Sequence, residues 1–172
     1  MAVNVPVRDL RSQPHTEPQR GIQDPLQETQ LLYGERVHII KQEGDWVNVE
    51  AVEQPEWTHA RRWRGYPGWL PLSALSPWKD RMAPTIVVTR KWVRTWRDSA
   101  QHTPAPWSFA MGTRLHGFAD GQRWQITLLD GTTVWMARAD ARSLAQLRGL
   151  PTSQQRDAIL RSAEQFLGDP YF

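Results

Sequence analysis

The stretch Arg64-Gly65-Tyr66-Pro67-Gly68-Trp69-Leu70-Pro71-Leu72 decides the fold that this sequence predicts. Pro67 lies between two glycines, which predicts a tight turn, because proline presets φ and Gly68 can adopt the positive φ that most residues avoid. Tyr66 and Trp69 lie on either side of this turn. The last four residues predict a short strand, with its proline at an edge or bulge. A rigid turn that presents two aromatic side chains can pack into a core or form one wall of a binding site.

Short strands precede this stretch. Residues 3–10, 36–40 and 45–52 alternate apolar and polar side chains, which is typical of half-buried strands. A long polar loop over residues 11–28 follows the first of them, and loops of that length are often functional. A hairpin turn at residues 42–45 joins the other two.

A similar order of strands and glycine turns recurs between residues 85 and 144. The sequence therefore predicts two copies of one five- or six-stranded unit, over residues 1–80 and 81–150. Short strands with many turns favour small β-barrels, which close their own sheet edges. The predicted fold class is mainly β, with two small barrels in tandem followed by a C-terminal α-helix over residues 151–172.

The C-terminal segment has a different pattern. Residues 153–167 are rich in helix formers and predict an amphipathic helix, which Gly168 ends. Its apolar face carries Ile159, Ala163, Phe166 and Leu167. Either the β units or a following domain has to cover that face.

Four tryptophans occupy positions that match between the two units. These residues, predicted to pack in the structural core, are Trp46, Trp69, Trp124 and Trp135. Trp57 and Trp63 instead lie in an insertion that the second unit lacks. They are therefore candidates for a surface that faces a glycan or a cleft.

The composition excludes several kinds of site. The absence of cysteine removes disulfides, thiolate metal ligands and a cysteine nucleophile. No apolar run is long enough for a membrane helix, and the N-terminus lacks the basic segment and apolar core of a signal peptide. The five histidines have no metal-ligand spacing, and no glycine-rich phosphate loop is present, so no metal and no cofactor are predicted.

Charge is unevenly distributed along the chain. The formal net charge is +3, but residues 84–150 carry nine basic and four acidic side chains. Arginines interleaved with tryptophans can bind nucleic acid or another anionic polymer. Because the basic residues are scattered between strands, a solvated basic face is the simpler interpretation, and no nucleic-acid partner is predicted.

Three segments carry a resemblance to a known family. They are Val5-Pro6-Val7-Arg8-Asp9-Leu10-Arg11, Thr29-Gln30-Leu31-Leu32-Tyr33-Gly34-Glu35 and Gly65-Tyr66-Pro67-Gly68-Trp69. They resemble bacterial SH3 (SH3b) domains and, more specifically, the N-terminal part of NlpC-type cell-wall cysteine peptidases of the γ-D-glutamyl-diamino acid endopeptidase, or dipeptidyl-peptidase VI, group. In that group two SH3b domains precede a papain-like catalytic domain. Residues 158–172 are similar to the opening helix of that catalytic domain.

The resemblance implies a role in recognition rather than catalysis. The chain has no cysteine and ends before the family's catalytic Cys and His, so by itself it is expected to hold no catalytic residues. It is predicted to be the substrate-recognition and targeting module of a peptidase that cleaves γ-D-Glu-diamino acid bonds, with the downstream catalytic domain missing. The expected partner is a peptidoglycan-derived peptide, L-Ala-γ-D-Glu-diamino acid, or the cell-wall polymer. The alternative is a stand-alone module that binds cell-wall glycan or peptide.

The resemblance also implies a site. In the family, the first SH3b domain supplies a carboxylate and a tyrosine that hold the free amine of the peptide's L-Ala. By motif position Tyr66 is the expected tyrosine and Glu35 the expected carboxylate, with Asp45 and Glu43 as alternatives. The competing interpretation makes Glu35 a solvated turn residue. The compartment is left open between the cytoplasm, where muropeptides are recycled, and the cell envelope.

Overall fold

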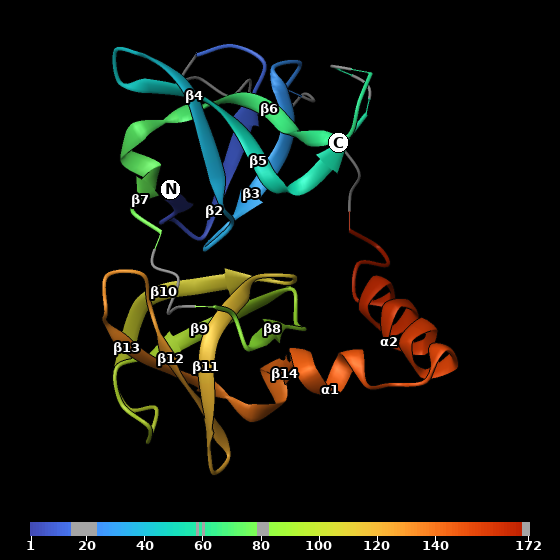
Figure 1. The fold of residues 1–172 in the computed structure, drawn as a ribbon. Coiled ribbons are helices and arrows are strands. Elements are labelled where there is room, and N and C mark those ends of the chain that lie inside the picture. The colour runs from blue at the N-terminus through green and yellow to red at the C-terminus, as the bar shows by residue number, and fades with distance from the viewer. Residues whose placement is uncertain (15–23, 58, 60, 79–82, 170–172) are drawn as a thin grey trace. The chain divides into compact units, whose positions relative to one another are not determined.

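The computed structural model describes residues 1–14, 24–57, 59, 61–78 and 83–169. The chain divides into two compact units, Met1–Trp78 and Lys79–Tyr171 (Figure 1). Both units are built from antiparallel strands, and two α-helices follow the last strand. The predicted mainly β class is confirmed.

Unit 1 contains one larger sheet and one short strand pair. Its strands are β1 (Ala2–Val3), β2 (Val7–Arg11), β3 (Gln27–Leu32), β4 (Val37–Glu43), β5 (Trp46–Glu56), β6 (Arg64–Pro71) and β7 (Leu75–Ser76). A 3₁₀ turn, η1 (Leu72–Ala74), precedes β7. The larger sheet has the order β3-β2-β6-β5-β4, and β1 pairs with β7.

Unit 2 contains a sheet with the order β10-β9-β13-β12-β11-β8-β14. Its strands are β8 (Ile86–Val88), β9 (Trp92–Trp96), β10 (Pro104–Ala110), β11 (Arg114–Asp120), β12 (Arg123–Thr127), β13 (Thr133–Ala137) and β14 (Ala141–Ser143). The 3₁₀ turn η3 (Arg138–Asp140) precedes β14, and the helices α1 (Leu144–Arg148) and α2 (Thr152–Glu164) follow it.

The sheets do not close into barrels, contrary to the expectation from the sequence. In the part of unit 1 that the structure describes, β3 and β4 are the two edges of the five-stranded sheet and do not pair. In unit 2 the edges are β10 and β14. Alternating apolar and polar residues predict which face of a strand is buried. Closure depends instead on strand tilt and stagger, which that alternation does not encode.

Each unit has an apolar core that follows the predicted alternation. On β5, Val47, Val49 and Ala51 are fully buried, and the residues before and between them are partly exposed. Full burial of a valine side chain such as Val47 or Val49 contributes about 1.5–3 kcal/mol to folding. In unit 2 the largest fully buried side chains include Ile86, Phe109, Ile126, Leu128 and Met136.

Residues 64–71 of the stretch that suggested a tight turn form one continuous strand, β6, so the predicted turn is wrong. Gly68 lies outside the left-handed region. Its lack of a side chain serves packing instead, because a Cβ there would lie 2.5 Å from Leu10 Cγ and 3.0 Å from the Arg11 carbonyl oxygen. Pro67 pairs with Glu50 of β5. Since β2 meets β6 at Trp69, Pro67 lies on a part of β6 with one strand neighbour, where a missing N–H is tolerated.

The hairpins show where the predicted matching of tryptophans fails. The β4–β5 and β11–β12 hairpins both turn at glycines with positive φ. Counted from those glycines, the counterpart of Trp46 is Arg123, and Trp124 lies one position further along β12. A shift of one residue reverses the face, so Trp124 is buried and Trp46 is only half-buried. Trp69 and Trp135 do correspond, because each pairs with the same position of the preceding strand.

The predicted C-terminal helix is present as α2. Gln165 Nε2 donates to the Thr89 carbonyl oxygen, and Lys91 pairs with Asp169 at 2.7 Å, so the end of α2 is attached to the sheet of unit 2. The apolar face remains open, since Ile159 is 68% exposed and Leu167 80% exposed. Within the described residues, no helix combines the length and the apolar character needed to cross a membrane.

Candidate functional site

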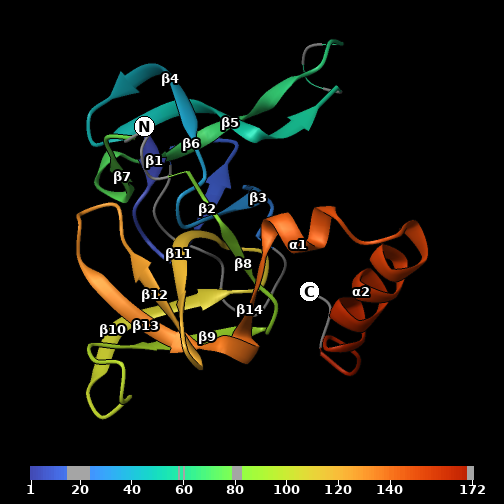
Figure 2. The same ribbon diagram turned by 60° about the horizontal axis from the view of Figure 1, so that its bottom comes forward.

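The last residues of β5 and the first of β6 form a two-stranded ribbon that extends beyond the rest of the sheet (Figure 2). Glu56 pairs with Arg64 at its outer end. In unit 2 the corresponding strands β12 and β13 are only five residues long each, so the ribbon is particular to unit 1. It carries the two tryptophans that the sequence singled out. Trp63 directly precedes the first residue of β6, and Trp57 directly follows the last residue of β5.

Trp57 and Trp63 lie next to each other on this ribbon. Their ring centroids are 6.0 Å apart at an interplanar angle of 59°. The side chains are 50% and 71% exposed, so they add little to the core. Adjacent exposed aromatic rings are available to contact a ligand.

Tyr66 lies at the base of the ribbon and is half-buried. Its hydroxyl donates a 3.0 Å hydrogen bond to Oε2 of Glu28, which belongs to β3. The carboxylate partner of Tyr66 is therefore Glu28, a residue that the sequence analysis did not single out. The two lie 38 positions apart, and only the pairing of strands across the sheet brings them together.

His59 and Glu56 complete the cluster around Tyr66. The imidazole of His59 contacts the Tyr66 ring edge-on, with centroids 5.2 Å apart. Its Nδ1 lies 3.2 Å from Glu56 Oε2 and its Nε2 lies 4.0 Å from Glu28 Oε2. The backbone N–H of His59 also donates to Glu56 Oε2 at 3.1 Å. The imidazole thus lies between two carboxylates, of which Glu56 is almost fully buried.

The surroundings of Tyr66 keep its hydroxyl protonated. Burial raises the pKa of Tyr66 above its usual value of 10.0, and the hydrogen bond to Glu28 raises it further. The negative charges of Glu28 and Glu56 act in the same direction. The phenol therefore remains a neutral hydrogen-bonding group throughout the physiological pH range.

Glu35 lies beside this cluster rather than in it. Its Oε2 accepts a 2.9 Å hydrogen bond from Gln54 Nε2, which also donates to the Gln30 carbonyl oxygen. Gln54 Oε1 in turn accepts from the Thr29 hydroxyl. Glu35 is thus linked through Gln54 to β3, the strand that carries Glu28.

The two alternative carboxylates lie elsewhere. Glu43 pairs with Lys41 at 2.7 Å on the exposed β4–β5 hairpin, and Asp45 is in the turn of that hairpin. Both lie near the start of β5, five residues along that strand from Ala51, the position that Tyr66 pairs with. One feature of the sequence points to Glu28, namely that it directly precedes the motif of residues 29–35. The sequence analysis instead assigned the carboxylate to Glu35, the last residue of that motif.

The cluster has the chemistry of a site for an alkylammonium group. Glu28 supplies a negative charge with 28% of its side chain exposed. The Tyr66 hydroxyl donates a hydrogen bond to Glu28 and keeps its proton. The lone pairs of its oxygen can therefore accept a hydrogen bond from a ligand. An ammonium group donates to a carboxylate in a strong charge-assisted hydrogen bond. Among the described residues, no group of three or more metal-ligating side chains is arranged to hold a metal ion.

The tryptophans predicted for the core differ in burial. Trp69 and Trp124 are 8% and 4% exposed, whereas Trp46 and Trp135 are half-buried. Trp124 Nε1 donates to two backbone carbonyl oxygens, those of Arg138 and Ala141. The ring of Trp69 lies 4.8 Å beneath Lys41 Nζ.

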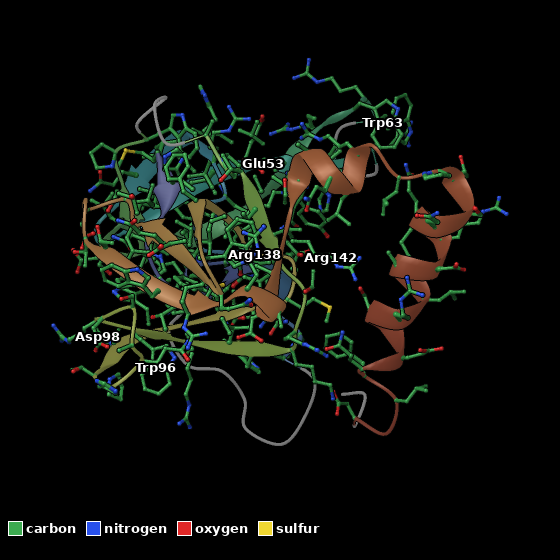
Figure 3. All side chains as sticks on the ribbon, turned by 90° about the horizontal axis from the view of Figure 1, so that it is seen from below. Glu53, Trp63, Trp96, Asp98, Arg138 and Arg142 are labelled. Atoms are coloured by element: carbon green, nitrogen blue, oxygen red, sulfur yellow. The ribbon has the colours of Figure 1, made fainter. Side chains whose placement is uncertain are left out.

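Unit 2 has a groove of about 990 Å³ between its sheet and its helices. The groove is lined by apolar side chains such as Leu144 and Ile159 and by arginines that include Arg142 and Arg161. Arg142, on β14, lies beside α2 in Figure 3. The residues that the sequence predicts for the site all lie outside this groove.

The sequence has homologues among bacterial peptidases. It is 29% identical over 150 residues to a gamma-D-glutamyl-L-lysine dipeptidyl-peptidase of Bacillus cereus, which covers 84% of this chain and 43% of that protein. It is 27% identical over 157 residues to the enzyme of the same name from Bacillus subtilis, covering 86% of this chain and 47% of that one. The chain thus spans a little under half the length of these relatives. No protein-family model matches the sequence.

The fold also has a counterpart among solved structures. A crystal structure of an NlpC/P60 family protein from Bacillus cereus ATCC 10987 matches 99% of this chain and 65% of that one, with a TM-score of 0.79 and 23% identity. At that identity the match concerns the fold. Together, the comparisons relate the sequence to gamma-D-glutamyl-L-lysine dipeptidyl-peptidases and the fold to an NlpC/P60 family protein.

Proposed function

We propose that this chain is the substrate-recognition part of a peptidase that acts on peptidoglycan peptides, and that unit 1 binds the free α-amine of the peptide. The observation that carries the proposal is the hydrogen bond between Tyr66 and Glu28 at the base of the tryptophan-bearing ribbon. A dipeptidyl-peptidase removes two residues from a free N-terminus, so such an enzyme has to recognise an amine. The names of the relatives therefore support an ammonium-binding cluster in this part of the chain.

The binding mode follows from the geometry of the cluster. The ammonium group donates to Glu28 and to the hydroxyl oxygen of Tyr66. Glu35, the carboxylate expected from the sequence, acts indirectly in this proposal. It holds Gln54, and Gln54 in turn holds β3, the strand that carries Glu28. Trp57 and Trp63 provide an apolar wall beside the bound peptide.

Catalysis comes from a separate peptidase domain in this proposal. The chain has no cysteine, so it has no thiolate with which to attack a peptide bond. The open apolar face of α2, where Ile159 and Leu167 are exposed, offers that domain a contact surface. The two units are proposed to be SH3b-type domains. The order β2-β6-β5-β4 in unit 1 and β9-β13-β12-β11 in unit 2 supports this assignment.

Titration of the 172-residue chain with the tripeptide L-Ala-γ-D-Glu-L-Lys, followed by NMR, tests the proposal. The resonances of unit 1 should shift with the free tripeptide. Acetylation of its amine should weaken binding about tenfold, which corresponds to about 1.4 kcal/mol. Glu28→Gln should have the same effect, whereas the matched control Glu43→Gln, in the exposed hairpin, should bind normally.

Two results would reject the amine site: equal binding of the acetylated and free peptides, or an unchanged affinity of Glu28→Gln. A larger loss for Glu35→Gln than for Glu28→Gln would return the direct role to Glu35. Binding of intact cell-wall polymer without any binding of the tripeptide would favour the stand-alone module, for which the exposed pair Trp57 and Trp63 is the relevant surface.

A further inference from the structure

The groove of unit 2 lies apart from the proposed amine site. It is bounded by the sheet, α1 and α2, all of which belong to unit 2, whereas Tyr66 and Glu28 belong to unit 1. Its volume of about 990 Å³ lies at the upper end of the range of roughly 300–1,000 Å³ that is typical of ligand sites. The groove is therefore large enough to hold a ligand of its own.

Hydrogen bonds at both ends of α2 fix the wall that this helix contributes to the groove. In the first turn, Gln155 Nε2 donates to the Leu150 carbonyl oxygen at 2.8 Å. After the last turn, Gln165 Nε2 donates to the Thr89 carbonyl oxygen at 3.0 Å. All four residues line the groove. The groove is thus formed before a ligand binds, so binding loses less conformational entropy than it would if α2 had to be ordered first.

Apolar side chains from the sheet, α1 and α2 line the groove. They are Val88, Met111, Leu144, Leu147, Leu150 and Ile159. On α2, Ala158 and Ser162 lie one turn apart and line the groove together with Ile159, and their small side chains let another helix approach closely. Ile159 is 68% exposed, so a ligand that covers it gains from the burial of apolar surface.

Three exposed arginines line the groove without a carboxylate partner among the residues that the structure describes. They are Arg142 of β14, Arg148 of α1 and Arg161 of α2. Arg90 also lines the groove, but its charge acts on the carboxylate of Asp140. Among the described residues that line the groove, Glu164 is the one acidic residue. The groove therefore combines apolar side chains with an excess of positive charge.

We propose that the groove of unit 2 binds an acidic amphipathic helix of a partner protein. The apolar side chains of that helix, spaced three and four residues apart, pack against the leucines of α1 and against Ile159. Its carboxylates form bidentate hydrogen bonds with Arg142, Arg148 and Arg161. Because these arginines come from three different elements, they match a ligand with several separate carboxylates better than a molecule with a single anionic group. A helix is about 10 Å across with its side chains, so the groove accommodates about two turns.

This inference rests on unit 2 alone and does not depend on the amine site of unit 1. Ile159 belongs both to the groove and to the open face of α2 that the proposal above offers to the peptidase domain. Leu167 lies on the same face but outside the groove. A helix in the groove therefore covers part of that face and leaves Leu167 available for a second contact.

Fluorescence anisotropy of the full chain with a synthetic peptide tests the proposal. The probe is a fluorescein-labelled peptide of about 12 residues, near the shortest length at which an isolated helix forms. It consists of glutamate and leucine, with the leucines at i, i+3, i+4 and i+7 so that they lie on one face. The control peptide carries lysine in place of every glutamate. The glutamate peptide should bind at least about tenfold more tightly than the lysine peptide, a difference of about 1.4 kcal/mol.

Charge reversal in the groove should reverse this preference. Arg142→Glu and Arg161→Glu should each weaken binding of the glutamate peptide about tenfold, and the double variant should bind the lysine peptide instead. Arg94→Glu, at an exposed arginine of unit 2 outside the groove, is the matched control. Ile159→Ala should also weaken binding, whereas Leu167→Ala should not. All of these side chains are exposed, so the fold should be retained.

Equal binding of the two peptides, or an unchanged affinity in both Arg142→Glu and Arg161→Glu, would overturn the proposal. Binding of the chain to phosphatidylglycerol vesicles, lost in the same variants and without binding of the glutamate peptide, would instead assign the groove to a membrane surface. Each variant should bind the tripeptide L-Ala-γ-D-Glu-L-Lys as the parent chain does. Failure of the amine site and failure of the helix-binding groove are therefore separate results.

Discussion

The hydroxyl of Tyr66 donates a 3.0 Å hydrogen bond to Glu28, a residue 38 positions earlier in the chain. The bond joins β6 to β3 and sets a neutral phenol against a partly exposed carboxylate. His59 and Glu56 surround the pair from the ribbon that unit 1 alone possesses. The cluster is therefore assembled from three separate parts of the unit 1 chain.

Tyr66→Phe removes only the oxygen of this hydrogen bond. The ring keeps its edge contact with His59, so the fold should be retained, with a loss of about 1 kcal/mol in the free energy of unfolding. Binding of L-Ala-γ-D-Glu-L-Lys should weaken about tenfold, because the ammonium group loses one acceptor. Urea denaturation and NMR titration measure the two effects. Unchanged tripeptide affinity would give Tyr66 a purely structural role.

The titration of Tyr66 makes unit 1 sensitive to alkaline pH. Its pKa is raised in the folded chain by burial and by Glu28, so the folded state favours the protonated phenol. The resulting stabilisation is fully present below pH 10, the unfolded pKa, and is lost as the pH rises through the folded value. The difference in unfolding free energy between the parent chain and Tyr66→Phe should therefore shrink above pH 10. A difference that is constant from pH 8 to 11.5 would contradict the raised pKa.

Gly68→Ala should destabilise unit 1 through a steric clash. The added Cβ would lie 2.5 Å from Leu10 Cγ and 3.0 Å from the Arg11 carbonyl oxygen, which forces β2 and β6 apart. A loss of about 1–3 kcal/mol is expected from overpacking of this kind. Gly149→Ala is the control, since its nearest contact is 3.5 Å and its φ is −80°. Thermal unfolding should show a lower midpoint for Gly68→Ala and an unchanged midpoint for Gly149→Ala.

The buried ion pair between Arg11 and Asp24 should show strong coupling. Arg11→Met removes the guanidinium that pairs with the buried Asp24 carboxylate, which should cost about 3 kcal/mol. Combining it with Asp24→Asn also removes the buried negative charge and should restore part of that loss. A double-mutant cycle in urea measures the coupling, and additive effects would show that the pair contributes nothing. Glu43→Gln, at an exposed pair, should change stability by less than about 1 kcal/mol.

Trp57→Ala and Trp63→Ala should separate binding from stability. Both side chains are at least half exposed, so each replacement should change the unfolding free energy by no more than about 0.5 kcal/mol. If the ribbon forms a wall of the peptide site, tripeptide affinity should fall and the tryptophan fluorescence change on binding should diminish. Trp124→Ala, at a buried position, should instead lose stability by about 3–5 kcal/mol.

Local patterns in the sequence predicted several strands and the hairpin turns, but neither strand β3 nor the continuation of β6 through Gly68. The alternation over residues 45–52 gave the buried face of β5, and the glycines of the β4–β5 and β11–β12 hairpins have the positive φ that their turns require. The helix over residues 152–164 followed from its composition. These features depend on neighbours within a few positions, where side-chain spacing and backbone preference act directly.

The sequence by itself thus determined the hairpin strands of each unit, the buried face of β5, the C-terminal helix and the choice of Tyr66 as a candidate site residue. Only the tertiary structure decided that Gly68 is needed for packing rather than for a turn, that Trp124 is one position out of register with Trp46, and that Glu28 is the partner of Tyr66. The physical reason is the same in each case. Strand pairing brings together residues that are distant in the chain, and a register difference of one residue reverses the face on which a side chain lies.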